Sequence, residues 1–274
     1  MIRKAVDKAK EADVIIAVLG EDEKRCGESK SRTGLNLPGR QLQLLMALHK
    51  TGKPIVLVLI NGQPLTINWE DRFIPSILEA WFPNAVGGKA IADAIFGAYN
   101  PGGKLPVTFP KTTGQIMLNF PFKPGSQAGQ PTNGPNGYGN TSVVGPIYPF
   151  GYGLSYTSFD YQNLKIDLDH FKTKNEIHIE VDITNTGKVR GDEVVQLYLK
   201  DLVSSVTVYE SQLRGFERVT LNPGETKTVA FTLKKDDMEL LDINLNRVVE
   251  PGDFEICIGS SSEDIRLKET FFLK

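Results

Sequence analysis

The 274-residue sequence has little of several features that mark particular classes of protein. It contains only two cysteines, Cys26 and Cys257, which are about 230 residues apart, so a disulfide framework or a cysteine-type zinc site is excluded. Its three histidines, His49, His170 and His178, are too scattered along the chain to indicate a metal site. We therefore expect neither a metal nor a cofactor.

Strong net charge and long apolar runs are also missing. The chain has 31 Lys and Arg against 33 Asp and Glu, a net charge of −2, whereas nucleic-acid binding needs clustered positive charge. The longest apolar run, residues 54–60, has the length of a strand and falls far short of the roughly 18 residues of a membrane span. Residues 1–14 lack the apolar segment of a signal peptide. We expect no nucleic acid and no membrane among the partners.

The first half of the sequence alternates helical patterns with short apolar runs. Leu42, Leu45, Met46 and His49, for example, recur at helical spacing. Strands that are apolar on both faces and joined by helices indicate a largely parallel sheet covered on two sides, an α/β sandwich. The patterns predict helices over residues 2–12, 40–50 and 88–98, and buried strands over 14–19, 55–60, 76–82 and 105–109.

The last third of the sequence has a different period. Apolar and polar residues alternate over 177–183, 229–233 and 254–258, and turn signals such as Pro223-Gly224 and Pro251-Gly252 separate these runs. Short alternating strands with such turns are typical of an all-β, antiparallel sandwich of the immunoglobulin or fibronectin III kind. The fold class is therefore α/β followed by a β-sandwich.

Between these parts, residues 124–153 contain 13 Gly or Pro among 30 residues and no charged side chain. A structureless stretch of this length is a linker or a functional loop. We expect domains at 1–123 and 159–274 with a connecting loop at 124–158. For 124–145 we favour a surface loop packed across both domains over a linker or a flap that shapes a binding site.

The loop after the first predicted strand is the richest place for chemistry, because ligands of open α/β sheets favour the carboxyl ends of the strands. Residues 20–32 hold four carboxylates, four cations and Cys26. A charged loop alone is more often solvated surface, and Cys26 without a nearby histidine is more often an incidental small residue than a reactive thiol. Spacing alone yields no complete catalytic set.

Read together, the motifs resemble the C-terminal part of a glycoside hydrolase family 3 β-glucosidase, of the bacterial periplasmic type. The Asn-Pro-Gly-Gly-Lys-Leu-Pro and Pro-Phe-Gly-Tyr-Gly-Leu-Ser-Tyr signatures are specific, and the last third resembles the family's fibronectin type III-like domain. The resemblance covers essentially the whole chain. It is carried by residues 12–41, 51–65, 87–110 and 146–159 and, in the last third, by 184–199, 213–226 and 250–261.

The resemblance implies that two domains contribute residues to the active site. In that family an N-terminal TIM barrel supplies the nucleophilic aspartate and most glucose contacts, and the next domain lends a general acid/base glutamate from a loop. By the motif Gly-Glu-Ser-x-Ser-Arg at 27–32, that glutamate is Glu28. Glu21, in Leu-Gly-Glu, matches another family position and is expected to be structural. Gly34 stands where members commonly carry Asp, and 83–86 departs from the usual Pro-Gly-acidic run.

The expected chemistry sets a condition on Glu28. Retaining glycosidases place two carboxyls about 5–5.5 Å apart, one attacking the sugar and one protonating the leaving oxygen. The acid needs a raised pKa, whereas Arg25, Lys30 and Arg32, which flank Glu28 in the sequence, would lower it. Either these side chains point away from Glu28, or burial against the barrel and the sugar outweighs them.

The chain itself has no room for the barrel, since eight βα units need about 250 residues. We therefore expect a fragment or one half of a split enzyme, inactive alone, whose parent hydrolyses terminal β-linked glucose from oligosaccharides or aryl glycosides. The resemblance implies a periplasmic or extracellular location, and a stabilising or homodimer-forming role for the fibronectin-like domain. Two alternatives remain open: a non-catalytic carbohydrate-binding or assembly module, and a family 3 β-xylosidase fragment.

Overall fold

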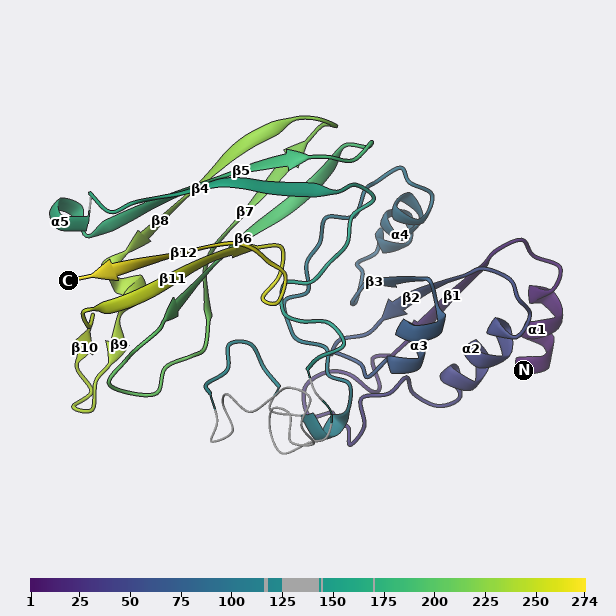
Figure 1. The fold of residues 1–274 in the computed structure, drawn as a ribbon. Helices are drawn as coiled ribbons and strands as arrows, with labels where there is room; N and C mark the ends of the chain where they lie inside the picture. The colour runs from purple at the N-terminus through teal and green to yellow at the C-terminus, as the bar shows by residue number, and fades with distance from the viewer. Residues whose placement is uncertain (116–117, 125–142, 144, 170) are drawn as a thin grey trace. The chain divides into compact units, whose positions relative to one another are not determined.

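The computed structural model describes residues 1–115, 118–124, 143, 145–169 and 171–274 (Figure 1). They form two compact units, the first built mainly from Met1–Phe96 and the second mainly from Pro149–Lys274. The intervening chain contributes to both, with Gly97–Thr108 in the second unit and residues 109–115 in the first. Most of the predicted loop at 124–145 lies outside the described residues, so its role stays a prediction. In the described part, every helix is too short or too polar to cross a membrane.

The first unit contains a three-stranded parallel sheet with the strand order β1-β2-β3. Ile15 of β1 lies opposite Ile55 of β2, and Val56 lies opposite Ser76 of β3. The parallel α/β fold predicted from the sequence is confirmed. The elements of this unit are α1 (Ile2–Ala9), β1 (Ile15–Gly20), α2 (Gln41–His49), β2 (Ile55–Ile60), α3 (Asn68–Phe73), β3 (Ser76–Glu79), α4 (Gly87–Ile95) and the 3₁₀ turn η1 (Thr113–Gln115).

Burial differs between the central and the edge strand of this sheet. In β2 the consecutive side chains of Leu57, Val58 and Leu59 are fully buried, so both faces of the central strand are covered as expected. In β1 only one face is covered, by a cluster that includes residues of α1 and α2, and Ile16 and Val18 on the other face remain 44% and 53% exposed. Within the described residues, both faces of β2 are therefore buried, as predicted, whereas β1 is buried on one face only.

The strand predicted at 105–109 is wrong. Phe109 makes only an isolated antiparallel bridge with Tyr148, and no strand forms in this segment. Pro106 and Pro110 explain the difference, because proline has no N–H to donate to a ladder. The segment therefore stays outside the parallel sheet, and only its last residue is buried: Phe109 is 1% exposed, whereas Val107 is 37% exposed.

The helix α3 was missed because six residues are too few to show a helical period. Its aromatic side chains pack against α2: the ring centroids of Trp69 and Phe73 each lie 5.7 Å from that of His49. His49, which continues the apolar face of α2, is exposed and contacts both rings at the surface.

The two glycine-rich motifs around 100–106 and 149–156 meet in the second unit. Lys104 Nζ lies 3.0 Å from Glu193 Oε1 and donates to the carbonyl oxygen of Gly153 at 3.0 Å. A Cβ atom on Gly153 would lie 2.2 Å from the carbonyl oxygen of Gly103. These glycines therefore allow a close backbone approach that a buried ion pair then secures.

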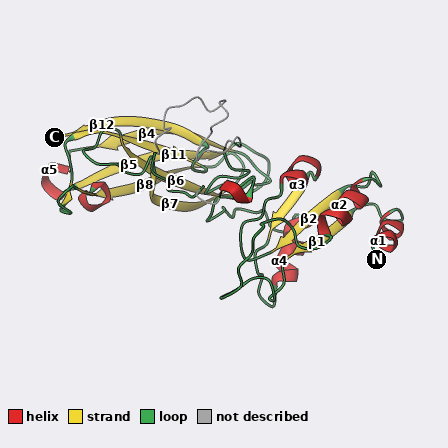
Figure 2. Ribbon diagram, turned by 90° about the horizontal axis from the view of Figure 1, so that it is seen from below, coloured by secondary structure: helices red, strands yellow, loops and turns green. Residues whose placement is uncertain are grey.

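The second unit is an antiparallel β-sandwich (Figures 1 and 2). One sheet has the order β12-β11-β6-β7 and the other β4-β5-β8, and β9 and β10 form a separate two-stranded ribbon. This confirms the predicted fibronectin-like architecture. Its elements are β4 (Phe159–Asp167), α5 (Phe171–Lys174), β5 (Glu176–Asn185), β6 (Gly191–Asp201), β7 (Gln212–Leu221), β8 (Thr226–Lys234), η2 (Lys235–Met238), β9 (Leu240–Leu241), β10 (Arg247–Val248), β11 (Gly252–Gly259) and β12 (Ile265–Leu273).

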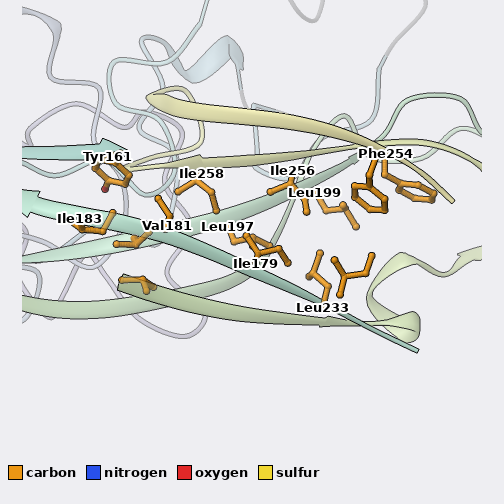
Figure 3. Packing of buried hydrophobic residues seen from close by; sticks show 14 of the residues in the cluster. Tyr161, Ile179, Val181, Ile183, Leu197, Leu199, Leu233, Phe254, Ile256 and Ile258 are labelled. Atoms are coloured by element: carbon orange, nitrogen blue, oxygen red, sulfur yellow. The ribbon is translucent and has the colours of Figure 1, made fainter. Parts of the chain in front are cut away.

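The core of the sandwich lies between its two sheets, where alternate side chains of β5, β6 and β11 point toward one another (Figure 3). The strand β6 departs most from the alternating pattern, because it is buried on both faces along most of its length, and the end of β11 is buried on both faces as well. The outer face of β6 carries Tyr198, whose hydroxyl donates to Gln196 Oε1 and whose ring meets Phe120 edge-on at 5.5 Å. Alternation of apolar and polar residues in the sequence therefore identifies β5, β8 and β11 but not β6.

Candidate active-site loop

The charged loop between β1 and α2 leaves the sheet at the carboxyl end of β1, the edge where β2 and β3 also end. Side chains that follow these three strands therefore meet at one edge. The sequence placed its candidate Glu28 on this loop, together with Glu21. The structure gives these two carboxylates very different surroundings.

The start of the loop is fastened to the start of α2. Gln41 donates from Nε2 to the carbonyl oxygen of Gly20 at 2.7 Å, and its Oε1 accepts from the Gly20 N–H at 2.7 Å. Gly20 has φ 140°, and an added Cβ would lie 1.9 Å from the carbonyl oxygen of Ile60. Only glycine fits this point, where the chain turns away from the sheet.

Glu21 is the inner anchor of the loop. Its side chain is fully buried and forms an ion pair with Arg32, which is itself largely buried. Its Oε1 also accepts from Gln63 Nε2 at 3.0 Å, and its Oε2 from the Gly62 N–H at 3.4 Å. Arg32 then donates to the carbonyl oxygen of Asn36 at 2.6 Å. A carboxylate held in this way joins both ends of the loop to the segment after β2.

Glu28 lies at the outer part of the same loop and is exposed. Two residues with positive φ flank it, Gly27 at 134° and Ser29 at 60°. Its carboxylate makes neither a hydrogen bond nor an ion pair with any residue that the structure describes. The loop therefore presents this carboxyl outward while its base is fixed.

The three cations that flank Glu28 in the sequence are engaged elsewhere. Arg25 pairs with Asp22 at 2.7 Å, Lys30 donates to the carbonyl oxygen of Glu23, and Arg32 pairs with Glu21. The sequence left open whether these side chains point away from Glu28 or whether burial outweighs their charge. The structure favours the first alternative, since all three side chains are bound to other partners. Two of the three positive charges near Glu28 are thus paired with carboxylates, and the third, on Lys30, is directed to a backbone carbonyl.

A half-buried carboxyl that the sequence did not single out lies at the end of β3. Glu79 accepts from the Trp81 N–H at 3.0 Å and from Asn61 Nδ2 at 3.3 Å. Burial raises the pKa of Glu79 to about 7, although these two hydrogen bonds oppose the shift. Asn61 is fully buried, and its Oδ1 has no hydrogen-bond partner among the described residues. The sequence offered a signal only for Asn61, which directly follows the strand predicted over 55–60, because Glu79 lies in the middle of the strand predicted over 76–82.

Cys26 has a packing role. A Cβ atom on Gly62 would lie 2.3 Å from Cys26 Sγ and 2.6 Å from Phe82 Cε2, so the thiol and the ring both close over that glycine. Cys26 and Cys257 are both free. Within the described part of the chain, His, Cys, Asp and Glu side chains form no group of three or more that could hold a metal ion.

Comparison with known proteins decides the family. Residues 1–156, more than half of the chain, match the model of the glycosyl hydrolase family 3 C-terminal domain. The chain belongs to glycosyl hydrolase family 3. Residues 193–262 match the fibronectin type III-like domain, in agreement with the β-sandwich of the second unit.

Several family 3 proteins match nearly the whole chain. A β-xylosidase of Formosa agariphila is 46% identical over 268 residues, which are 97% of this chain and 36% of that protein. A periplasmic β-glucosidase of Salmonella typhimurium is 42% identical, over 97% of this chain and 35% of that protein. A β-glucosidase from Listeria innocua, crystallised in complex with glucose, has a TM-score of 0.89 at 34% identity, over 99% of this chain and 38% of its own. The chain thus spans little more than a third of these proteins' length.

Membership of glycosyl hydrolase family 3 confirms the resemblance inferred from the motifs, and with it the order of the two domains. The part of the family to which the chain corresponds is the C-terminal one. The role of Glu28 rests on the motif at 27–32 and on the loop's geometry, and stays a prediction.

Proposed function

We propose that this chain is the C-terminal part of a retaining β-glucosidase and that Glu28 is its general acid/base. The proposal depends most on the placement of Glu28, an exposed carboxyl on a loop whose base is anchored by Glu21 at the carboxyl ends of three parallel strands. The proposed domains are 1–123 and 159–274, joined by 124–158.

The proposed reaction is a double displacement. Glu28 protonates the leaving oxygen while a carboxylate from outside this chain attacks the anomeric carbon, and it then removes a proton from the water that releases the sugar. Glu21 is unsuited to this role, because its side chain is fully buried and paired with Arg32. The nucleophile is expected on an N-terminal TIM barrel, so the 274 residues alone are expected to be inactive.

The proposed substrate is terminal β-linked glucose in oligosaccharides or aryl glycosides. A β-xyloside is the second candidate, because the Formosa agariphila relative at 46% identity is a β-xylosidase. We propose a periplasmic or extracellular location from the Salmonella typhimurium relative. A homodimer through the fibronectin-like domain is a further proposal that size measurements in solution would test.

A chimera tests the function directly. Residues 1–274 replace the matching C-terminal part of the Salmonella typhimurium enzyme, and hydrolysis of 4-nitrophenyl β-glucoside and β-xyloside is compared. We expect activity in the chimera, near-complete loss with Glu28→Gln, and little change with Glu23→Gln, an exposed carboxylate of the same loop. Equal activity of the two variants would refute the role of Glu28.

A non-catalytic module makes a different prediction. If the chain were a carbohydrate-binding unit, calorimetry of the 274 residues with glucose and cellobiose would show binding. The proposed function predicts no measurable heat, because most sugar contacts are expected on the barrel.

A further inference from the structure

Phe82 is a half-exposed aromatic residue that lies beside the loop carrying Glu28. Its side chain is 50% exposed, three residues after the end of β3. Its ring and Cys26 Sγ close over Gly62, where an added Cβ would lie within 2.6 Å of both. Because Cys26 precedes Glu28 by two residues, Phe82 borders the part of the loop from which the proposed acid projects.

The backbone holds Phe82 in place through the residue before it. Trp81 has φ 51°, a conformation that a bulky side chain adopts only under strain. Glu79 accepts from the Trp81 N–H at 3.0 Å and is itself held by Asn61, while the Trp81 ring packs edge-on against Phe109 at 5.9 Å. Strain of this kind persists only where the surroundings maintain it, and it clusters at functional sites.

The chemistry of the proposed reaction indicates what Phe82 would face. A general acid sits at the oxygen of the leaving group, so the surface around its loop borders that group and not the sugar ring that is cleaved off. An exposed aromatic face there offers apolar contact area at low conformational cost. The packing around the 21–32 loop uses only one side of Phe82, since half of the residue is exposed.

We propose that Phe82 is a specificity-determining residue whose exposed ring contacts the leaving group of the substrate and favours apolar or aromatic groups there. The inference rests on the proposed function. Specificity for the leaving group would then depend partly on this chain, whereas specificity for the cleaved sugar would depend mainly on the N-terminal TIM barrel. Glu79 and Asn61 then act as positioning residues through Trp81.

The test uses the chimera described above with benzyl and ethyl β-glucosides, whose leaving alcohols are similar in acidity and differ in the aromatic ring. We expect Phe82→Ala to lower kcat/KM at least ten-fold for the benzyl glucoside, mainly through KM, and less than two-fold for the ethyl glucoside. Phe82→Tyr should retain the preference. Phe96→Ala is the matched control, because Phe96 is 78% exposed at the end of α4.

Each other outcome counts against the proposal. An equal loss with both glucosides would show a general structural effect, and unchanged kinetics would show that the ring does not meet the leaving group. An inactive wild-type chimera would overturn the proposed function and this inference together. An active chimera with no Phe82 effect would overturn this inference alone.

Discussion

The two units of the chain bury polar side chains in different ways. In the sandwich, Asn185 Nδ2 donates to the carbonyl oxygen of Leu221 at 3.0 Å, and Gln196 Nε2 to that of Gly151 at 3.1 Å. Both amides complete main-chain hydrogen bonds between segments. In the parallel-sheet unit, the buried Glu21 and Asn61 and the half-buried Glu79 lie where strands end.

Under the proposed function, the polar groups at the strand ends position the loop that carries Glu28, whereas the buried amides of the sandwich stabilise its fold. Buried amides that bond to the main chain are the usual way to satisfy an interior. In the first unit an ion pair, a carboxyl whose pKa is raised to about 7 and an amide oxygen unpartnered among the described residues lie together at one sheet edge. The described part of the second unit also contains a largely buried ion pair, Lys104–Glu193, and an unpartnered Arg214 Nε, so the groups of the first unit are distinguished by their gathering at the ends of parallel strands. Groups with perturbed pKa values cluster at functional sites. Substitutions in the sandwich should therefore change stability, and those at the strand ends should also change the loop.

The largest expected effect on stability lies in the sandwich core. Ile179→Ala removes a side chain that is fully buried between the two sheets and should lower the free energy of unfolding by about 2–5 kcal/mol. Far-UV circular dichroism during urea unfolding measures the change. Both tryptophans, Trp69 and Trp81, lie in the other unit, so their emission in the native protein should stay unchanged. A shifted native emission would contradict the separation of the two regions.

A smaller loss is expected at the anchor of the loop. Glu21→Gln leaves Arg32 largely buried without its counter-charge, which should cost about 3 kcal/mol. Backbone amides of residues 22–32 should also exchange hydrogen faster. Asp22→Asn is the control, because its pair with Arg25 is half-exposed and should cost less than about 1 kcal/mol. Equal effects of the two variants would show that Glu21 does not anchor the loop.

The next effect depends on pH. The pKa of Glu79 is about 7 in the folded chain against 4.5 as the ordinary value, so the unfolded state loses its proton first as pH rises. The free energy of unfolding should fall between pH 4.5 and 7 because of this group, by up to about 3 kcal/mol. Glu79→Gln should remove that fall, which urea unfolding at pH 5 and pH 8 would measure. An identical pH dependence in the variant would contradict the burial of the carboxyl.

The smallest effect is expected at Gly34, a residue of the segment between β1 and α2. An added Cβ there meets no atom within 4 Å, so Gly34→Ala should change stability by less than about 1 kcal/mol, in the stabilising direction. At Gly62, where a Cβ would meet Cys26 Sγ and Phe82, the same substitution should destabilise. Thermal unfolding of the two variants gives the comparison, and a larger loss at Gly34 would contradict the loop geometry.

The sequence predicted most of what depends on local pattern. Helical spacing located α2, alternation located β5, and the motif at 27–32 pointed to the loop that holds Glu28. Each of these signals lies within a few consecutive residues. The strand predicted at 105–109 shows where local pattern fails. Its apolar residues suggested a strand, but Pro106 and Pro110 have no N–H groups to donate to the hydrogen bonds of a sheet.

The cluster of Asn61, Glu79 and Trp81 could not be predicted in the same way. Its contacts arise because β2 and β3 lie side by side in a particular register, and a sequence pattern does not specify which strand ends meet. The pairing of Arg32 with Glu21 is similar: in the sequence Arg32 stands four residues from Glu28, yet its partner is eleven residues away.

The most direct measurement of the central claim is rescue of the chimera carrying Glu28→Ala by azide. An anion that attacks the glycosyl–enzyme intermediate without help from a general base should raise the rate and yield β-glucosyl azide. The variant should also retain far more activity toward 2,4-dinitrophenyl β-glucoside, whose leaving group needs no proton, than toward cellobiose. An equal loss with both substrates and no azide product would show that Glu28 is not the acid/base.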